Sequence, residues 1–170
     1  MRGERPTVAP FEIRPILAAE TRQMRHEILR PHQTPEELVF PGDLDPKSLH
    51  IGGFVDGEMV GVASVMPSAM PGDPPKEAWQ LRGMAVRPRF RRMGMGRAMV
   101  MACLRHVALD GGTLLWCRAR TGAVPFYQSL GFRTEGDEFN IPYSGPHFVM
   151  WRPITTEERV KRSQDTRRQA

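Results

Sequence analysis

Alternating apolar and polar positions predict that most of the chain forms β-strands. Segments 49–55 and 58–66 are rich in Val, Ile and Phe and flank Asp56-Gly57. That dipeptide suits the positive φ angles of a tight turn, so the two segments predict a hairpin. The other segments with a strand pattern are 11–16, 78–86, 113–120, 132–141 and 146–153.

Longer stretches have the period of an amphipathic helix. Residues 16–31 place Ile, Met and Leu side chains on one face, and Pro31 stops the helix. Residues 95–109 gather small and apolar side chains on one face and keep arginines on another. Segment 122–130 predicts a short helix that ends at a glycine, and the proline-rich stretch 34–48 predicts a loop with at most one helical turn.

The order of these elements indicates a fold class. A strand, helix, strand and helix set inside a hairpin-rich chain predicts a single α/β domain, with a mixed sheet of about six to seven strands and about four helices. We expect this domain to span residues 1–154. The tail, residues 155–170, is polar and has no aromatic residue. We expect it to be flexible, because it cannot bury enough surface to offset the entropy of ordering.

The charge and the cysteines indicate what the protein binds and where it is expected to act. The chain has 24 Lys plus Arg against 19 Asp plus Glu, and most of the cations are arginines. Arginine favours bidentate contacts with phosphate or carboxylate, so an anionic ligand is expected, although a solvated surface gives the same balance. Cys103 and Cys117 lie in apolar stretches without the spacing of metal ligands, so we expect free buried thiols, no metal and a cytoplasmic protein. No apolar run approaches the roughly 18 residues of a membrane span, and no membrane partner is expected.

The stretch 87–100, RPRFRRMGMGRAMV, joins the end of a predicted strand to the start of a predicted helix. The first N–H groups of a helix have no internal partner and point at such a loop. Gly94 and Gly96 let a phosphate approach the main chain, so the stretch predicts an anion site. The arginines that can add charge are Arg89, Arg91, Arg92 and Arg97. A P-loop lysine is missing, and Met99 stands where a dinucleotide fingerprint needs its third glycine. An exposed basic loop is the alternative.

Two motifs stand in a fixed order along the chain. Arg91-Arg92-Met93-Gly94-Met95-Gly96 fits the pattern R/Q-x-x-G-x-G/A, between a strand and a helix. Residues 123–132, AVPFYQSLGF, fit A-x-x-F-Y-x-x-L-G-F. Together they resemble the GNAT superfamily of acetyl-CoA-dependent N-acetyltransferases, whose order of strands and helices is also similar to the one predicted for Phe11 to Trp151.

The resemblance implies how acetyl-CoA is held. The pantetheine arm would lie beside strand 78–86 like an added strand, because a splayed strand edge offers unpaired N–H and C=O groups. The Met84 N–H would stabilise the negative charge that develops on the thioester carbonyl. The pyrophosphate would lie on the amides from Arg92 to Arg97. The implied cofactor contacts are Met84, Ala85, Val86, Arg91, Arg92, Met93, Gly94, Met95, Gly96, Arg97, Arg120 and Phe126.

The implied catalytic acid is Tyr127, which would protonate the departing CoA thiolate, since a phenol stays protonated at neutral pH. A packing role beside Phe126 is the alternative. The general base, which would take the proton of the acceptor amine, remains open. Gln80 stands where some family members carry a Glu, and an amide cannot take a proton. The candidates are Glu77, His50 and His147, with water chains as relays, and His147 is preferred because the fold places its strand near the acceptor.

The remaining implied site residues face the acceptor. Gln80, Arg82 and His147 are the expected substrate contacts, framed by the loops 31–47 and 67–77. Arg82, two residues before Met84, is expected to share its face of the strand and to orient an acidic group on the acceptor, or to pair with a neighbouring carboxylate.

The expected function is acetyl transfer from acetyl-CoA to a primary amine of a small molecule or peptide, by direct attack. A transferase with another acyl-CoA donor and a catalytically silent CoA-binding module are the alternatives, because fold does not guarantee function. A nucleic-acid-binding domain is disfavoured, since no aromatics are interleaved with the arginines. The sequence allows a homodimer but does not indicate one.

Overall fold

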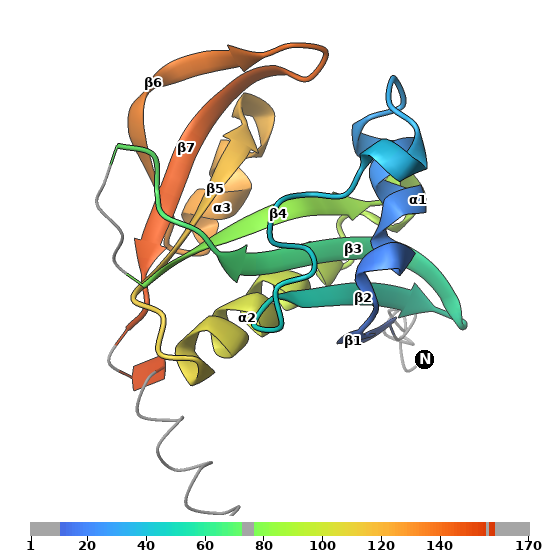
Figure 1. Ribbon diagram of the computed structural model, residues 1–170, viewed down its shortest axis with the longest axis horizontal. Coiled ribbons are helices and arrows are strands. Elements are labelled where there is room, and N and C mark those ends of the chain that lie inside the picture. The colour runs from blue at the N-terminus through green and yellow to red at the C-terminus, as the bar shows by residue number, and fades with distance from the viewer. Residues whose placement is uncertain (1–10, 73–76, 156, 159–170) are drawn as a thin grey trace, which may run out of the picture.

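The centre of the molecule is one seven-stranded sheet in the order β1-β2-β3-β4-β5-β7-β6 (Figure 1). The computed structural model describes residues 11–72, 77–155 and 157–158. The strands are β1 (Phe11–Pro15), β2 (Leu49–Val55), β3 (Glu58–Pro67), β4 (Ala78–Val86), β5 (Leu114–Arg120), β6 (Arg133–Ile141) and β7 (Gly145–Pro153). Only β4 and β5 pair in parallel; the other neighbours are antiparallel. The predicted single α/β domain with a mixed sheet is therefore confirmed.

The helical elements differ in part from expectation. The α-helices are α1 (Arg22–Met24), α2 (Met95–Leu109) and α3 (Val124–Ser129), with short turns η1 (Ala18–Thr21), η2 (Arg25–Leu29), η3 (Pro35–Glu37), η4 (Pro88–Phe90) and η5 (Thr121–Ala123). The described chain thus has three α-helices where about four were predicted. The segment 34–48 forms only the turn η3, because its prolines remove amide donors. The N-terminal helix forms as η1, α1 and η2 in succession, and η2 is a π-turn.

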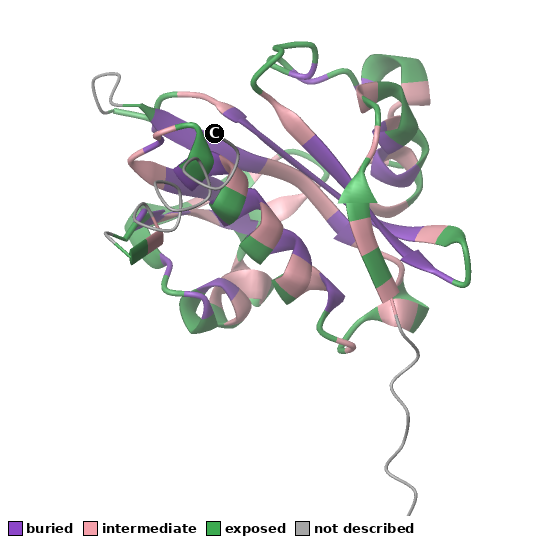
Figure 2. Cartoon of the chain, turned by 90° about the horizontal axis from the view of Figure 1, so that it is seen from below, coloured by how far each residue is buried: buried purple, intermediate pink, exposed green. Residues whose placement is uncertain are grey.

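Two cores lie on opposite faces of the sheet. The apolar face of α2 packs on one face, and its residues Met99, Val100 and Val107 are fully buried there. On the other face, Met24 of α1 packs against Val62 and Ala85. In Figure 2 the buried residues run along the middle strands, as expected for a sheet covered on both sides. Both predicted helix faces are therefore confirmed.

The sheet splits in its middle. β4 and β5 pair only where Ala78–Gln80 meets Leu114–Trp116. In Figure 1 the two strands start side by side at the lower left and then diverge, so that β5, β7 and β6 tilt away from β1 to β4. Beyond Gln80 the edge of β4 that faces β5 has no strand partner among the described residues. The divergence opens a V-shaped gap with unpaired main-chain groups on one wall.

A β-bulge in β4 changes which way its side chains point. Opposite β3, Val62 pairs with Ala85 and Ser64 with Arg82, so Gly83 and Met84 together face one residue of β3. Gly83 has a φ of +61°, which glycine adopts without strain. The bulge interrupts the alternation of faces.

The prediction that Arg82 and Met84 share a face of the strand is therefore wrong. The guanidinium of Arg82 lies over the ring of Phe40, 4.1 Å from its centroid, on the side of the sheet that carries η2. The side chain of Met84 instead reaches Tyr127, on the side that carries α3. The extra residue of the bulge is the physical reason.

Three further expectations concern the cysteines, the membrane and the ends of the chain. Cys103 and Cys117 are free and buried, as predicted, and burial raises the pKa of each thiol to about 12. No helix in the described ranges is long and apolar enough to cross a membrane. The expected flexible tail, 155–170, lies outside the described residues except for three positions, and so does the start of the expected domain, 1–10. These boundaries remain predictions.

Candidate active site

The V-shaped gap between β4 and β5 holds a cleft of about 1060 Å³. At one end, called here the donor end, it is lined by 84–86, by parts of the loop before α2 and by α3. At the other, the acceptor end, it is lined by Arg30, Gln80, Arg82, Arg118, Arg120 and His147. The two ends lie on different faces of the sheet and meet where the strands diverge.

Most of the predicted cofactor contacts line this cleft. They are Met84, Ala85, Val86, Arg91, Arg92, Gly94, Gly96, Arg97, Arg120 and Phe126. Met93 and Met95 are not among the lining residues. The side chain of Met95 is buried, and it fills the space beside Gly53 and Gly61. Only the main chain of Met95 is therefore available to a ligand.

The loop before α2 presents a row of free amides at the donor end. The N–H groups of residues 92–97 donate no hydrogen bond to another described residue, whereas the N–H of Ala98 donates to the carbonyl of Gly94 at 3.0 Å. Gly94 is the N-cap and has a φ of +85°. A Cβ on Gly96 would lie 3.4 Å from the ring of Phe126 and 3.6 Å from Met84 Cε. The glycines thus keep the amides open to an anion.

Arginines around this loop differ in how they are held. Arg91 Nε donates to the carbonyl of Val86 at 2.9 Å. Arg92, with a φ of +64°, and Arg97 are exposed and form no ion pair with a described residue. Arg89 does not line the cleft. Arg92 and Arg97 therefore have their whole guanidinium groups free to meet an anion, and Arg91 keeps its charge although its Nε is bound to a carbonyl.

Tyr127 lies at the junction of the two ends. Its ring is buried edge-on against Phe126 and Phe132, with centroids 5.0 and 5.4 Å away. Its hydroxyl donates toward Sδ of Met84 at 4.0 Å. Burial, with a smaller effect of the two cysteines, raises the pKa of Tyr127 above its ordinary value of 10. The phenol is therefore protonated at neutral pH and lies beside the edge of β4.

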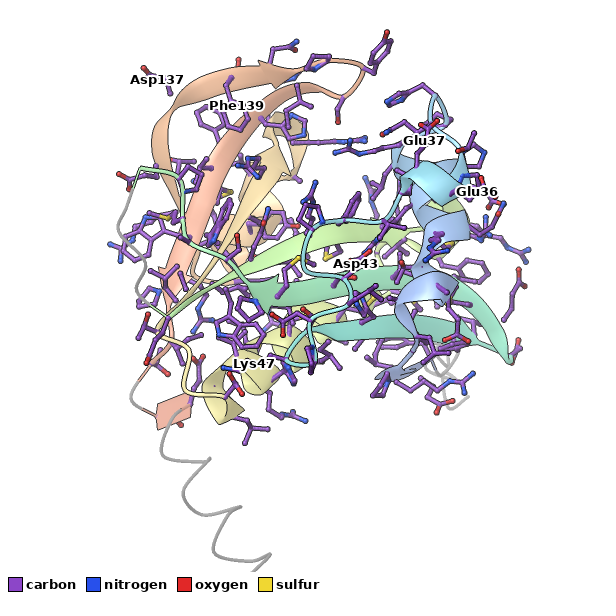
Figure 3. The ribbon with its side chains drawn as sticks, viewed as in Figure 1. Glu36, Glu37, Asp43, Lys47, Asp137 and Phe139 are labelled. Atoms are coloured by element: carbon purple, nitrogen blue, oxygen red, sulfur yellow. The ribbon has the colours of Figure 1, made fainter. Side chains whose placement is uncertain are left out.

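His147 faces the acceptor end from β7, where it pairs in register with Arg120. Its Nδ1 lies 2.8 Å from the carbonyl oxygen of Gly145. A carbonyl can only accept, so Nδ1 carries a proton, and in the neutral ring the lone pair lies on Nε2. Ser144 Oγ lies 3.5 Å from that Nε2 and also lines the cleft. Phe139, labelled in Figure 3, lies beside the ring with centroids 6.0 Å apart.

An aromatic contact spans the outer end of the gap. The ring of His32, in the loop after η2, stacks on Tyr143 in the turn between β6 and β7, with centroids 4.6 Å apart. Figure 1 shows these two loops approaching each other at the top of the molecule. The contact ties the half of the sheet that carries η2 to the half that carries β7.

Comparison with known proteins agrees with this geometry. The model of a family described as Acetyltransferase (GNAT) family matches residues 13–132. The chain belongs to this family. The GNAT chain is 34% identical over 146 residues to the uncharacterized N-acetyltransferase YitI of Bacillus subtilis (strain 168). The matched residues cover 86% of this chain and 98% of that protein.

Solved structures share the fold. Escherichia coli ElaA has a TM-score of 0.68 and 20% identity, over 84% of this chain and 99% of that one. An aminoglycoside 6′-N-acetyltransferase complexed with coenzyme A has a TM-score of 0.65 and 15% identity, over 85% of this chain and 97% of that one. The protein is thus a GNAT acetyltransferase, and acetyl-CoA is the acetyl donor of its family.

The two other candidate bases of this GNAT enzyme lie away from the cleft. His50 Nε2 donates to the carbonyl of Asp43 at 2.8 Å, and its Nδ1 accepts from Ser64 Oγ at 2.6 Å. Both nitrogens are therefore occupied. Glu77 is exposed and borders a separate hollow beside Lys47. Among the three predicted candidates, only His147 lines the cleft.

Sequence reasoning missed a buried cation beneath the acceptor end. Arg25 of η2 is fully buried and binds Asp43 through two hydrogen bonds of 2.6 and 3.0 Å. It also donates to Ser64 Oγ at 3.0 Å and lies 3.9 Å from the ring centroid of Phe40. Asp43 is labelled in Figure 3, in the loop that crosses the sheet. The signal was an arginine on the apolar stripe of the N-terminal helix, one position after Met24.

Proposed function

We propose that the protein transfers the acetyl group of acetyl-CoA to a primary amine by direct attack, without a covalent enzyme intermediate. The observation that carries the proposal is the convergence of an unpaired β4 edge at Met84, the phenol of Tyr127 and the free amides of 92–97 on one cleft. Family membership supports acetyl-CoA as the donor.

In this proposal the donor is held mainly by main-chain groups. The pantetheine arm adds to the open edge of β4 through Met84, Ala85 and Val86, so that its amides replace the missing strand. The pyrophosphate accepts hydrogen bonds from the free amides at the start of α2, assisted by the helix dipole. The thioester then lies where β4 and β5 diverge.

The chemistry follows from the groups around that point. The neutral amine attacks the acetyl carbonyl carbon, and the N–H of Met84 stabilises the developing oxyanion. The C–S bond breaks as the C–N bond forms, and the thiolate takes a proton from Tyr127. Because burial keeps Tyr127 protonated, the phenol holds its proton until the C–S bond breaks.

The proton of the acceptor ammonium needs a separate route. His147 offers a free Nε2 at the acceptor end, close to Ser144, and we assign it as the group that accepts the proton, directly or through water. Gln80 contributes polar contact but no basicity, since an amide does not accept a proton at neutral pH.

The test is release of free CoA from acetyl-CoA in the presence of amines, with the N-acetylated product identified by mass. The panel includes simple amines, polyamines, amino acids, aminoglycosides and peptides. Amine-dependent CoA release supports the proposal. Tight acetyl-CoA binding without release of free CoA for any amine would instead identify a silent CoA-binding module. A preference for propionyl- or succinyl-CoA would show that the acyl donor is not acetyl-CoA.

A further inference from the structure

The acceptor end carries positive charge without a matching acid. Arg30, Arg82, Arg118 and Arg120 line it, and no Asp or Glu of the described chain is among the residues that line the cleft. Gln80 is buried beside them, and its side-chain amide makes no hydrogen bond to a described residue. A concentration of guanidinium groups in a half-buried site is unfavourable unless an anion joins it.

Arg82 is the clearest case. Its guanidinium stacks on Phe40 at 4.1 Å, and Arg25 lies at 3.9 Å from the same ring centroid. Arg25 is neutralised by Asp43, whereas the guanidinium of Arg82 forms neither an ion pair nor a hydrogen bond with any residue in the described ranges. Stacking holds the plane of the guanidinium and leaves its N–H edges free, and Arg82 lines the cleft.

The surroundings of Arg82 disfavour the charged form of its guanidinium. Burial, and after it the neighbouring charges of Arg30, Arg118 and Arg25, lower the pKa of Arg82 to about 10. Asp43 opposes that trend but is already bound to Arg25. The cluster thus has more cations than the acidic residues in the described ranges balance.

The phosphates of the donor do not account for this charge. They have the free amides of 92–97 and the exposed Arg92 and Arg97 at the other end of the cleft. The bulge at Gly83 turns Arg82 to the face of the sheet opposite Met84, away from α3. The cations at the acceptor end therefore face the second substrate.

We infer that the acceptor is an amine that also carries a carboxylate or phosphate group, and that Arg82, assisted by Arg30 and Arg118, binds that anion. The inference rests on the proposed acetyl transfer and names its substrate class. The planar guanidinium pairs with either anion through two parallel hydrogen bonds. Polyamines and aminoglycosides bring only positive charge to the same place, and like charges repel.

The same arginines assist the loss of the amine's proton. A nearby positive charge favours the neutral form of an ammonium group, so the bound amine deprotonates more readily than in water. The leaving proton passes to His147 or to water, the C–N bond forms, the C–S bond breaks, and Tyr127 supplies the proton for the sulfur. This arrangement suits a site in which Gln80 stands in place of a carboxylate base.

The experiment compares matched acceptors that differ only in the anion. 5-Aminopentanoate is paired with pentylamine, and phosphoethanolamine with ethanolamine, with spermidine as a polycation. The anionic member of at least one pair should have a kcat/KM about 10-fold or more above its neutral partner. Preference in the first pair identifies a carboxylate and preference in the second a phosphate. Equal or better turnover of the neutral amines or of spermidine overturns the inference.

Variants of Arg82 locate the anion. R82Q should raise KM for the anionic acceptor by about 10- to 100-fold while leaving its acetyl-CoA affinity unchanged. R82K should recover part of the loss, because it restores a charge without the planar fork. R105Q is the matched control, since Arg105 is exposed on α2 and does not line the cleft. If R82Q and R105Q have the same KM as wild type, Arg82 does not bind the anion.

A binding measurement separates this inference from the proposed function. Calorimetry with the CoA complex of the full-length protein, titrated with each member of the pairs, needs no turnover. Tighter binding of the anionic members, lost in R82Q, supports the anion site even if none is acetylated, and in that case the proposed transfer falls. If neutral amines are acetylated as well as the anionic ones, the proposed acetyl transfer is supported and the anion site is contradicted.

Discussion

The two ends of the cleft are built from different parts of the chain. The donor end consists of main-chain groups of residues close in sequence, the amides of 92–97 and the edge of β4. The acceptor end consists of side chains from η2, β4, β5 and β7 that meet only in the folded protein. A main-chain site tolerates side-chain changes but depends on glycine geometry, whereas a side-chain site changes its specificity with single charges. One fold can therefore keep its donor and vary its acceptor.

The largest expected effect comes from the support of the acceptor end. Asp43→Asn leaves the buried charge of Arg25 without its partner and should lower the free energy of unfolding by about 3–5 kcal/mol. The matched control is Asp110→Asn, whose ion pair with Lys47 is exposed and 4.0 Å long, and which should change stability by at most about 1 kcal/mol. Denaturant unfolding at neutral pH measures both. Equal stabilities of the two variants would contradict the role given to Asp43.

The same pair gives the expected pH dependence. Burial raises the pKa of Asp43, but the hydrogen bonds and charge of Arg25 and the amide of Phe40 outweigh it, so the pKa lies below its ordinary value of 3.8. Because the folded pKa is the lower one, this stabilisation is complete above the ordinary value and is lost as the pH falls through the folded pKa. Asp43→Asn should therefore lose less stability than wild type between neutral pH and about pH 3.

The next largest effect tests the junction of the two ends. Tyr127→Phe should lower kcat by about 10²-fold, because only the proton donor for the thiolate is lost. Acetyl-CoA affinity should stay the same. The chain has 2 tyrosines, and Tyr143→Phe is the matched control, since Tyr143 is exposed and keeps its stacking on His32 without the hydroxyl. An unchanged kcat in Tyr127→Phe, with chemistry limiting the rate, would assign that ring to packing.

A smaller effect tests the donor end alone. Acetyl-CoA should raise the melting temperature by mass action, and Gly94→Val or Gly96→Val should weaken its binding by about 10-fold or more, which reduces the shift. Gly94→Val also strains a left-handed backbone, at about 1–2 kcal/mol. Gly57→Val carries the same strain in a hairpin turn with φ of +80° and open space around it. It should lower the melting temperature and keep the full acetyl-CoA shift. If both donor-end variants keep the full shift in melting temperature, this loop does not bind the phosphates of acetyl-CoA.

The donor end could be predicted from sequence because its signals are local. The spacing of glycines after Arg91 and the dipeptide Asp56-Gly57 each specify a backbone conformation within a few residues. The period of α2 likewise follows from side chains one turn apart. The hairpin and α2 are confirmed by the structure.

The acceptor end could not be predicted in the same way. The bulge at Gly83 depends on the register between β3 and β4, which no local pattern specifies, and it reverses the expected relation of Arg82 to Met84. The pairing of Arg25 with Asp43 joins residues separated by 18 positions through a proline-rich loop. Contacts of this kind depend on the whole fold.

The smallest expected effect concerns His147, the single predicted base that lines the cleft. If it accepts the proton of the acceptor amine, kcat/KM should rise across neutral pH, because free imidazole titrates in that range. His147→Gln should remove or displace this rise and lower kcat/KM by a few-fold at neutral pH, or about 10-fold at most if water replaces the ring. His106→Gln is the matched control, since His106 does not line the cleft and its Nε2 donates to the carbonyl of Lys47.

The acceptor distinguishes the remaining explanations for the same pH profile. With an amine of lower pKa, a rise that belongs to His147 stays at the same pH, whereas a rise that belongs to the ionisation of the free amine moves with the substrate. A profile that follows the amine and is unchanged in His147→Gln would show that the enzyme takes up the neutral amine directly. The proton would then be lost before binding, and the arginines of the acceptor end, which favour the neutral form, would be sufficient without a protein base.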